Sequence, residues 1–346
     1  MSRVARDWAD GAESPGRRRL RFAVTLGLLG LVAAACAADA PMDTFKPAGP
    51  NARTIDNLIT PVFWVAGVVF VAVEGMALIF VIRYRDRGEG PEPVQIHGNS
   101  RLEVGWTLIP AAILVTIAIP TIATIFNLAS KPANAINVTV TARQWWWEYN
   151  YTDLGVVTAN ELHMPVGQPL EITLIGADVI HSFWVPSLAG KTDVVPGREN
   201  HMNMTGDKVG TYLGQCTEFC GLSHANMRLK AMVQTPADFQ AWVDDQRQAA
   251  ATPAGGEAAD GLALFNAKGC AGCHTIQGVS KGTSGPNLTH LASRTSFAGS
   301  MFELNDENLA IWLANPPKVK PGSKMPDLNL SGDEITKLIA YLDTLE

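Results

Sequence analysis

Charge is scarce in this chain, and basic charge is scarcer than acidic charge. Over 346 residues, Asp, Glu, Lys and Arg make up 17%, with 27 basic against 33 acidic residues and a formal net charge of −6. A chain without a basic excess does not fit the nucleic-acid-binding class, whose members normally carry a basic face. Because 47% of the residues are hydrophobic, the composition also argues against a disordered chain and predicts that part of the protein lies in a membrane.

Cysteine is sparse as well. Five cysteines in 346 residues are too few and too unevenly placed for a disulfide scaffold. Cys36 stands alone, whereas Cys216 and Cys220 form one close pair and Cys270 and Cys273 form another. Such pairing predicts metal or cofactor chemistry at two places, and the length predicts two or three folded units.

Residues 1–36 have the layout of a secretory signal peptide. The basic segment Arg17–Arg19 precedes the apolar run Phe22–Val32, and small residues then lead to Cys36. This position of Cys36 resembles the cleavage box of bacterial lipoproteins, which makes Cys36 a candidate for lipid attachment. A third transmembrane helix is the alternative, but the run is shorter than the ~20 residues that a span requires.

Residues 57–130 are expected to form a transmembrane hairpin. The segments Pro61–Tyr84 and Trp106–Leu128 are apolar and long enough to cross a bilayer. The loop between them carries several arginines, which places the loop in the cytoplasm and the later domains on the outer face of a bacterial plasma membrane. Internal prolines leave buried helices of a soluble protein as the alternative, which two charge-poor runs beside a basic loop disfavour.

The remainder of the chain divides into a β part and a helical part. Residues 135–236 contain short runs rich in β-branched and aromatic residues, such as Ile136–Val140, which predict an all-β sandwich or barrel. Residues 237–256 are expected to be a helix and a small-residue linker. The last domain, residues 257–346, ends in a segment with an N-cap signal at Ser331 and apolar residues at helical spacing, which predicts a packed terminal helix.

One loop in the β part concentrates soft metal ligands: Cys216 and Cys220 are followed by His224 and Met227. Thiolates with imidazole suit copper or zinc, and the thioether favours copper, because zinc prefers four strong ligands. Two thiolates predict a pair of copper ions with bridging sulfurs, which requires a second histidine. A disulfide is the alternative, but it leaves the spacing of His224 and Met227 unexplained.

The segment Asp178–Phe183 supplies that second histidine. Together with Lys191–Asp193, Pro196–Arg198 and the Cys-x-Glu-x-Cys-x-x-x-His-x-x-Met loop, it resembles subunit II of the haem–copper cytochrome c oxidases. The resemblance covers roughly residues 57–234 and implies an all-β cupredoxin domain that holds a dinuclear CuA centre with bridging thiolates, terminal imidazoles and weak axial ligands. The ligands so implied are His181, Cys216, Glu218 through its backbone carbonyl, Cys220, His224 and Met227.

Three further roles are implied by the resemblance. Trp145, in an aromatic run, would receive electrons beside the copper, although such runs are also typical of a packed core. The Glu218 carboxylate would ligate Mg²⁺ at the contact with subunit I, with a plain solvent-facing carboxylate as the alternative. Glu103 would lie at the mouth of a proton pathway into subunit I, and an ordinary membrane-interface carboxylate would look the same.

The second cysteine pair belongs to a Cys-x-x-Cys-His pattern. In c-type haem attachment, two thiols such as Cys270 and Cys273 bond the haem, and an imidazole such as His274 becomes the proximal iron ligand. A thioredoxin-like motif would need a βαβ context, and a zinc site would need a second ligand pair. Haem c is therefore the predicted cofactor of the last domain.

The sixth haem ligand is less directly indicated. Met325, before a proline, resembles the distal methionine of class I cytochromes c, and Met301 and His290 compete for this role. A methionine ligand would raise the haem potential. The segment Ser284–Leu288 resembles the loop that packs on the proximal side of the haem in that family.

Together these features predict a multidomain membrane protein: a two-helix transmembrane hairpin, an all-β cupredoxin domain and a small all-α cytochrome c domain. The resemblance implies subunit II of an aa3-family oxidase of the caa3 type, which takes electrons from a cytochrome c or a quinol-oxidising complex and passes them to subunit I for proton-coupled oxygen reduction. Its partners would be subunit I, subunit III and membrane lipid. The alternatives are a CuA-bearing subunit of a nitric oxide reductase, a copper-free quinol oxidase subunit II and a membrane-anchored copper–haem electron shuttle.

Overall fold

The computed structural model describes residues 15–34, 40–85, 94–95 and 97–346. The chain forms two compact units that divide after Pro41. In the first unit, helix α1 (Pro15–Ala34) covers the apolar run of the expected signal peptide. Cys36, the candidate for lipid attachment, lies outside the described residues.

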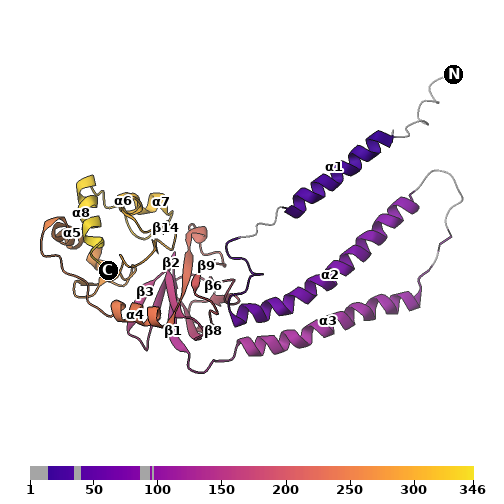
Figure 1. The fold of residues 1–346 in the computed structure, drawn as a ribbon, viewed down its shortest axis with the longest axis horizontal. Helices are drawn as coiled ribbons and strands as arrows, with labels where there is room; N and C mark the ends of the chain where they lie inside the picture. The colour runs from indigo at the N-terminus through magenta and orange to yellow at the C-terminus, as the bar shows by residue number, and fades with distance from the viewer. Residues whose placement is uncertain (1–14, 35–39, 86–93, 96) are drawn as a thin grey trace, which may run out of the picture. The chain divides into compact units, whose positions relative to one another are not determined.

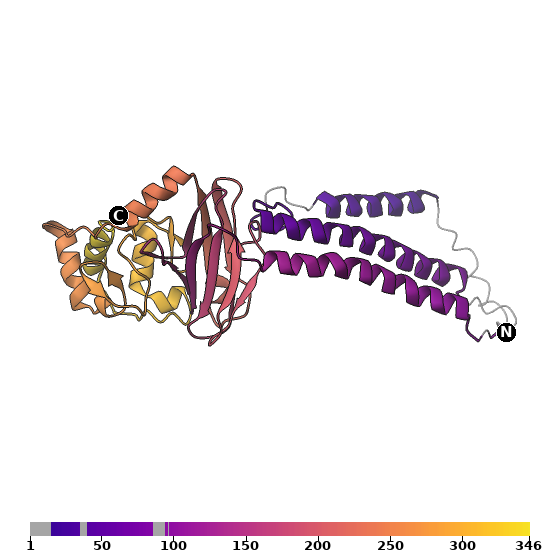
Figure 2. The same cartoon turned by 90° about the horizontal axis from the view of Figure 1, so that it is seen from below.

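The second unit begins with the expected hairpin. Helices α2 (Pro50–Arg83) and α3 (Ser100–Leu128) run side by side (Figures 1 and 2), and both are long and apolar enough to cross a membrane. Their large apolar side chains are exposed, as lipid-facing residues would be. Helix α3 starts before the predicted apolar run because the Asn99 side chain accepts hydrogen bonds from the first helical amides.

Helix α2 also starts earlier than the apolar run predicts, and its polar beginning is tied to the β domain. The amide of Asn51 donates to the side-chain oxygen of Asn203 at 2.7 Å. The amide of Asn203, in strand β8 (Asn200–Met204), donates in turn to the carbonyls of Leu128 and Ser130 at 2.9 and 3.0 Å. One side chain therefore joins the start of α2 and the end of α3 to the β domain.

The β domain consists of two five-stranded sheets, as the β-type sequence runs predicted. The segment Ile136–Val140 lies in β1, which pairs in parallel with β5 and antiparallel with β2. The first sheet has the order β3-β2-β1-β5-β8, with β1 Ile136–Arg143, β2 Trp146–Tyr151, β3 Val156–Ala159 and β5 Leu170–Gly176. The second sheet has the order β4-β10-β9-β6-β7, with β4 Glu161–Pro165, β6 His181–Trp184, β7 Thr192–Val194, β9 Gly210–Cys216 and β10 Arg228–Gln234.

Aromatic side chains fill the space between the two sheets. Trp147, Tyr149 and Phe183 are fully buried, and the Trp147 and Phe183 rings meet edge to face at 5.1 Å. Trp147 also contacts the ring of His181 at 6.1 Å. The core of the sandwich therefore supports one wall of the predicted copper site directly.

The C-terminal domain is helical, with two short antiparallel ladders. Helices α5 and α8 lie side by side (Figure 1), and Gly261 allows this approach because a Cβ there would lie 2.0 Å from the Lys337 carbonyl. Ser331 and Glu334 form the capping box of the predicted terminal helix. The helices are α4 Pro236–Gln246, α5 Gly256–Ala267, α6 Asp306–Ala314, α7 Pro316–Val319 and α8 Gly332–Leu342, with 3-10 turns η1 His224–Asn226 and η2 Cys270–Gly272; the ladders pair β11 Thr275–Ile276 with β12 Ser280–Lys281 and β13 Ser296–Phe297 with β14 Phe302–Glu303.

Candidate functional site

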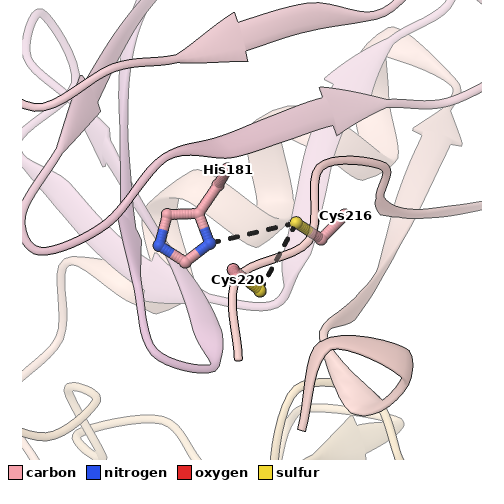
Figure 3. A group of neighbouring side chains, drawn as sticks. All are labelled: His181, Cys216 and Cys220. Atoms are coloured by element: carbon pink, nitrogen blue, oxygen red, sulfur yellow. Dashed lines mark hydrogen bonds between the residues drawn. The ribbon is translucent and has the colours of Figure 1, made fainter. Parts of the chain in front are cut away.

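The predicted copper ligands converge on one buried point. Figure 3 shows His181 from β6 pointing at the thiols of Cys216, the last residue of β9, and Cys220, in the loop that follows, with the Nδ1 of His181 at 3.9 Å from the sulfur of Cys216. The two sulfurs of Cys216 and Cys220 lie 3.8 Å apart, well beyond the ~2.05 Å of a disulfide bond. The ligand atoms of these three residues all lie within 4.8 Å of one another. The pair is therefore arranged for ions and not for a disulfide.

The remaining predicted ligands close the same cluster. The Nδ1 of His224 lies 3.5 Å and the sulfur of Met227 lies 3.9 Å from the sulfur of Cys220. The backbone carbonyl of Glu218 lies 3.2 Å from the sulfur of Cys216. Two thiols, two imidazole nitrogens, a thioether and a carbonyl thus surround one small volume, and this soft donor set fits copper.

Strand pairing explains how distant residues meet there. In the antiparallel pair of β6 and β9, Phe183 lies opposite Cys216. His181 and Cys216 are therefore set by the same ladder, which is anchored on the aromatic core. The other ligands follow within the loop after β9 and the turn η1, so a single register fixes the whole cluster.

Asp178 sets the tautomer of His181, a role that sequence analysis did not assign. Its carboxylate accepts a hydrogen bond from Nε2 of His181 at 2.8 Å, which leaves the lone pair of Nδ1 facing the sulfur of Cys216. Although burial opposes ionisation of Asp178, hydrogen bonds from His181 and from the amides of Gln144 and Val179 lower its pKa. The position of Asp178, three residues before His181, was the only feature of the sequence that could have suggested this role.

The two thiols of the cluster are not equivalent. Because the side chains of Cys216 and Cys220 share a hydrogen bond, the pKa of Cys216 falls to about 4, while the same hydrogen bond and burial raise the pKa of Cys220. The pair thus ionises once with ease, and the second ionisation requires added positive charge. Metal ions supply such charge, which is the physical reason that the site fits a cationic centre.

Asp178 gives a direct test of this arrangement. Asp178→Asn is expected to weaken copper binding by about 10–100-fold, the usual effect of losing a partner that orients a ligand. The measurement is competition with a copper chelator. Asp193→Asn, at an exposed position of β7, is the matched control and should bind copper as the unaltered chain does. Equal affinity in both variants would contradict the assignment.

The predicted haem residues line one cavity in the C-terminal domain. A cavity of about 360 Å³ is lined by Cys270, Cys273, His274 and Met325. Its remaining wall is largely apolar and includes Trp145 of the β domain. The cavity therefore brings together both attachment thiols and both predicted axial ligands, and it extends to the domain interface.

The cavity wall fits a haem in three further respects. The Nδ1 of His274 lies 2.8 Å from the Pro286 carbonyl, which can only accept, so Nε2 is left free to bind iron. The predicted proximal loop packs on this ring, and a Cβ at Gly285 would lie 2.6 Å from it. Arg294, also on the wall, has a buried Nε without a hydrogen-bond partner, which an acidic group of the cofactor would satisfy.

The structure separates Met325 from its competitors. Among the described residues, neither His290 nor Met301 lines the cavity. The His290 ring is engaged elsewhere, with Nδ1 at 2.6 Å from the Glu346 backbone carbonyl and Nε2 at 3.2 Å from the Gln248 carbonyl. Of the three candidates, Met325 has the position that a ligand needs.

The last three predicted residues occupy different environments. Trp145 is buried between the domains, and its indole nitrogen donates to the Cys220 carbonyl at 3.0 Å. Glu218 has an exposed side chain. Glu103 lies in the first turn of α3, where its carboxylate accepts a hydrogen bond from the Asn99 amide at 3.1 Å and so caps the helix.

Comparison with known proteins gives the family. Successive parts of the chain match the transmembrane domain of cytochrome c oxidase subunit II (residues 40–124), its periplasmic domain (156–234) and cytochrome c (258–346). The cytochrome c oxidase subunit 2 of Alkalihalophilus pseudofirmus is 36% identical over 330 residues, 93% of this chain and 96% of that protein. The chain belongs to the cytochrome c oxidase subunit II family. The corresponding Bacillus subtilis protein is 34% identical over 349 residues, 94% of this chain and 98% of that protein.

A solved structure of the periplasmic domain of subunit II of cytochrome oxidase from Bradyrhizobium japonicum is 31% identical, with a TM-score of 0.33, and the match covers 34% of this chain and 96% of that one. The matches to the family models and to the Alkalihalophilus pseudofirmus protein confirm the expected family and fold class. As a member of this family, the chain is one subunit of an oxidase complex. Its oxidase domain implies CuA copper, and its C-terminal domain implies haem c.

Proposed function

We propose that this subunit II belongs to an aa3-family oxidase of the caa3 type. It crosses the bacterial plasma membrane twice and holds the β and C-terminal domains on the outer face. The C-terminal domain accepts electrons from an upstream cytochrome c or quinol-oxidising complex, and the β domain passes them to subunit I for oxygen reduction with proton pumping. Subunit III completes the assembly.

One residue carries this proposal, because it touches both candidate cofactor sites. Trp145 lines the haem cavity and donates its indole N–H to the carbonyl of Cys220, a predicted bridging ligand. Trp145 is 6% exposed, so water is excluded from the contact. A continuous path of protein atoms therefore joins the two ligand clusters through one aromatic side chain.

Copper and haem, when bound, supply reversible one-electron transfer, and the chain holds their ligands still. His181 is fixed by Asp178, and His274 is fixed by the Pro286 carbonyl. Cys216 lies on a strand of the sheet. Because these groups are held by hydrogen bonds and by the aromatic core, little reorganisation of the protein is expected to accompany electron transfer.

We extend the proposal to two carboxylates. Glu218, exposed beside the copper ligands, would bind Mg²⁺ at the surface that meets subunit I. Glu103, at the start of α3, would serve the mouth of a proton pathway while it also caps the helix.

The test of the proposed function is the composition and redox spectrum of the purified complex. We expect dinuclear copper and covalent haem on this chain, a c-type band in the reduced-minus-oxidised spectrum, and co-purification with a large oxygen-reducing subunit. A chain without haem c, or with less copper than a dinuclear centre needs, would overturn the proposal. Reduction of nitric oxide by the complex in place of oxygen would favour the nitric oxide reductase alternative.

The axial role of Met325 gives a further prediction. Met325→Ala is expected to lower the potential of haem c by about 0.1 V or more, within the roughly 0.8 V range over which axial ligands set haem potentials. A redox titration followed at the haem band measures the change. Met301→Ala and His290→Ala are the controls and should leave the potential near its original value. A fall in potential in a control, with no change in Met325→Ala, would assign the ligand elsewhere.

A further inference from the structure

Two charged side chains are buried where the C-terminal domain meets the β domain, and neither is a predicted ligand of copper or haem, although Lys320 also lines the haem cavity. Glu161, in β4, is 1% exposed, and Lys320, after α7, is 3% exposed. Each belongs to one domain and bonds to the other. Burying a charge is costly unless hydrogen bonds or an opposite charge compensate it. The hydrogen-bond partners of the two residues therefore show which parts of the two domains they connect.

Glu161 is compensated by the C-terminal domain. Its carboxylate accepts hydrogen bonds from the Thr295 amide at 3.0 Å, the Thr295 hydroxyl at 2.6 Å and the Ser296 hydroxyl at 2.8 Å. Burial lowers the pKa of Arg294 to about 10, and the negative charge of Glu161 opposes that shift. Lys230 of the β domain also donates to the Thr295 hydroxyl at 2.8 Å.

Lys320 reaches in the opposite direction. Its ammonium donates to the carbonyl of Trp145, in the β domain, and to the carbonyl of Ala298, each at 2.6 Å. Burial lowers the pKa of Lys320 to about 7, because the charged ammonium loses its water. The hydrogen bonds to the two carbonyls offset part of this loss. A Cβ at Gly299 would lie 2.6 Å from the ammonium nitrogen, so the glycine leaves the space that the ammonium occupies.

The backbone that follows Lys320 packs against Trp145, the residue proposed to carry electrons between the two cofactor sites. At Gly322, a Cβ would lie 2.4 Å from the Trp145 ring. The carbonyl of the preceding residue, Pro321, accepts a hydrogen bond at 2.7 Å from the hydroxyl of Ser223, which lies between Cys220 and His224 in the loop of predicted copper ligands. The segment that leads to Met325 therefore contacts both the loop of predicted copper ligands and Trp145.

We propose that Glu161 and Lys320 are reciprocal positioning residues that hold the C-terminal domain in one pose over Trp145, and so set the rate of electron transfer between the two domains. The inference deepens the proposed function and rests on it. The partners of Glu161 lie in the C-terminal domain, and Lys320 binds the backbone carbonyl of Trp145 in the β domain. Glu161 therefore acts on the pose alone, whereas Lys320 also lines the haem cavity, so the haem spectrum must be recorded beside the transfer rate.

The experiment uses the purified oxidase complex with Glu161→Ala and Lys320→Met. Haem c is reduced by a light flash with a soluble photoreductant, and the rate of electron transfer to copper is followed by absorbance. Loss of a buried charged contact is expected to slow this transfer by about tenfold or more. Glu199→Ala and Lys318→Met, at exposed positions, are the matched controls and should keep the original rate.

A second readout separates pose from cofactor loss. Hydrogen exchange of the amides in residues 295–300 and 320–324 is expected to accelerate in both interface variants and in neither control, while the haem and copper spectra remain unchanged. Hydrogen exchange measures the contact between the two domains and does not depend on a cofactor. Its result can therefore be interpreted even if the proposed function is wrong. If Glu161→Ala does not assemble, Thr295→Val removes a donor from the other side. Unchanged transfer and unchanged exchange would overturn the proposal.

Discussion

Cys216→Ala is expected to leave this subunit II without a functional copper centre. The thiolate of Cys216 is the more easily ionised of the pair and lies near His181, Cys220 and the Glu218 carbonyl, so its removal leaves no bridging geometry. Electron delivery to subunit I should fall by more than about 100-fold, beyond the usual effect of losing a residue that only orients a metal ligand. Copper analysis and the oxygen consumption of the complex measure the two effects.

The control for this prediction is a change at a weak ligand. Met227→Leu keeps both thiolates and both imidazoles, so copper should remain bound while the potential of the centre shifts. Haem c should be retained in both variants, because its residues lie in another domain. A full copper content in Cys216→Ala would refute the bridging role.

The double change Cys270→Ala and Cys273→Ala is expected to abolish covalent haem attachment. Both thiols line the cavity beside His274, and without them no thioether bond can form. Haem staining of the denatured chain should disappear, and electron transfer from the upstream donor should fall by more than about 100-fold, since a central redox group is absent from its path. Copper content should be unchanged.

A matched histidine pair sharpens the second test. His274→Ala removes the predicted proximal ligand, whereas His290→Ala removes a ring that bonds the carbonyls of Gln248 and Glu346. Iron ligation, read from the haem spectrum, should change in His274→Ala and remain in His290→Ala. Haem staining that survives the double cysteine change would show that attachment uses other residues.

Ligands that lie close together in the sequence could be predicted from it. The candidate copper ligands Cys216, Cys220, His224 and Met227 lie close together at the end of β9 and in the loop after it, so their spacing indicates copper chemistry directly, and the Cys-x-x-Cys-His pattern indicates haem attachment in the same way. His181 was found through the family resemblance, since the strand pairing that brings it to Cys216 has no local signature.

Contacts between distant segments were not predictable in this way. Glu161 and Thr295 are 134 residues apart, and Lys320 and Trp145 are 175 apart; a lone Glu in a strand or a lone Lys after a helix resembles any surface charge. The start of α2 was missed for a related reason. A search for apolar runs ends where polar residues such as Asn51 begin, yet those residues continue the helix because they bond to the β domain.

The covering of Trp145 has a kinetic consequence. While Gly322 lies against its ring, a soluble protein cannot reach that surface, so under the proposed function transfer from the tethered domain would be a unimolecular step whose rate does not depend on donor concentration. The dependence of respiration on dilution and ionic strength would then arise on the exposed surface of the C-terminal domain, where the proposed donor would bind. Fusion of the two domains would thus move partner selection away from the copper site.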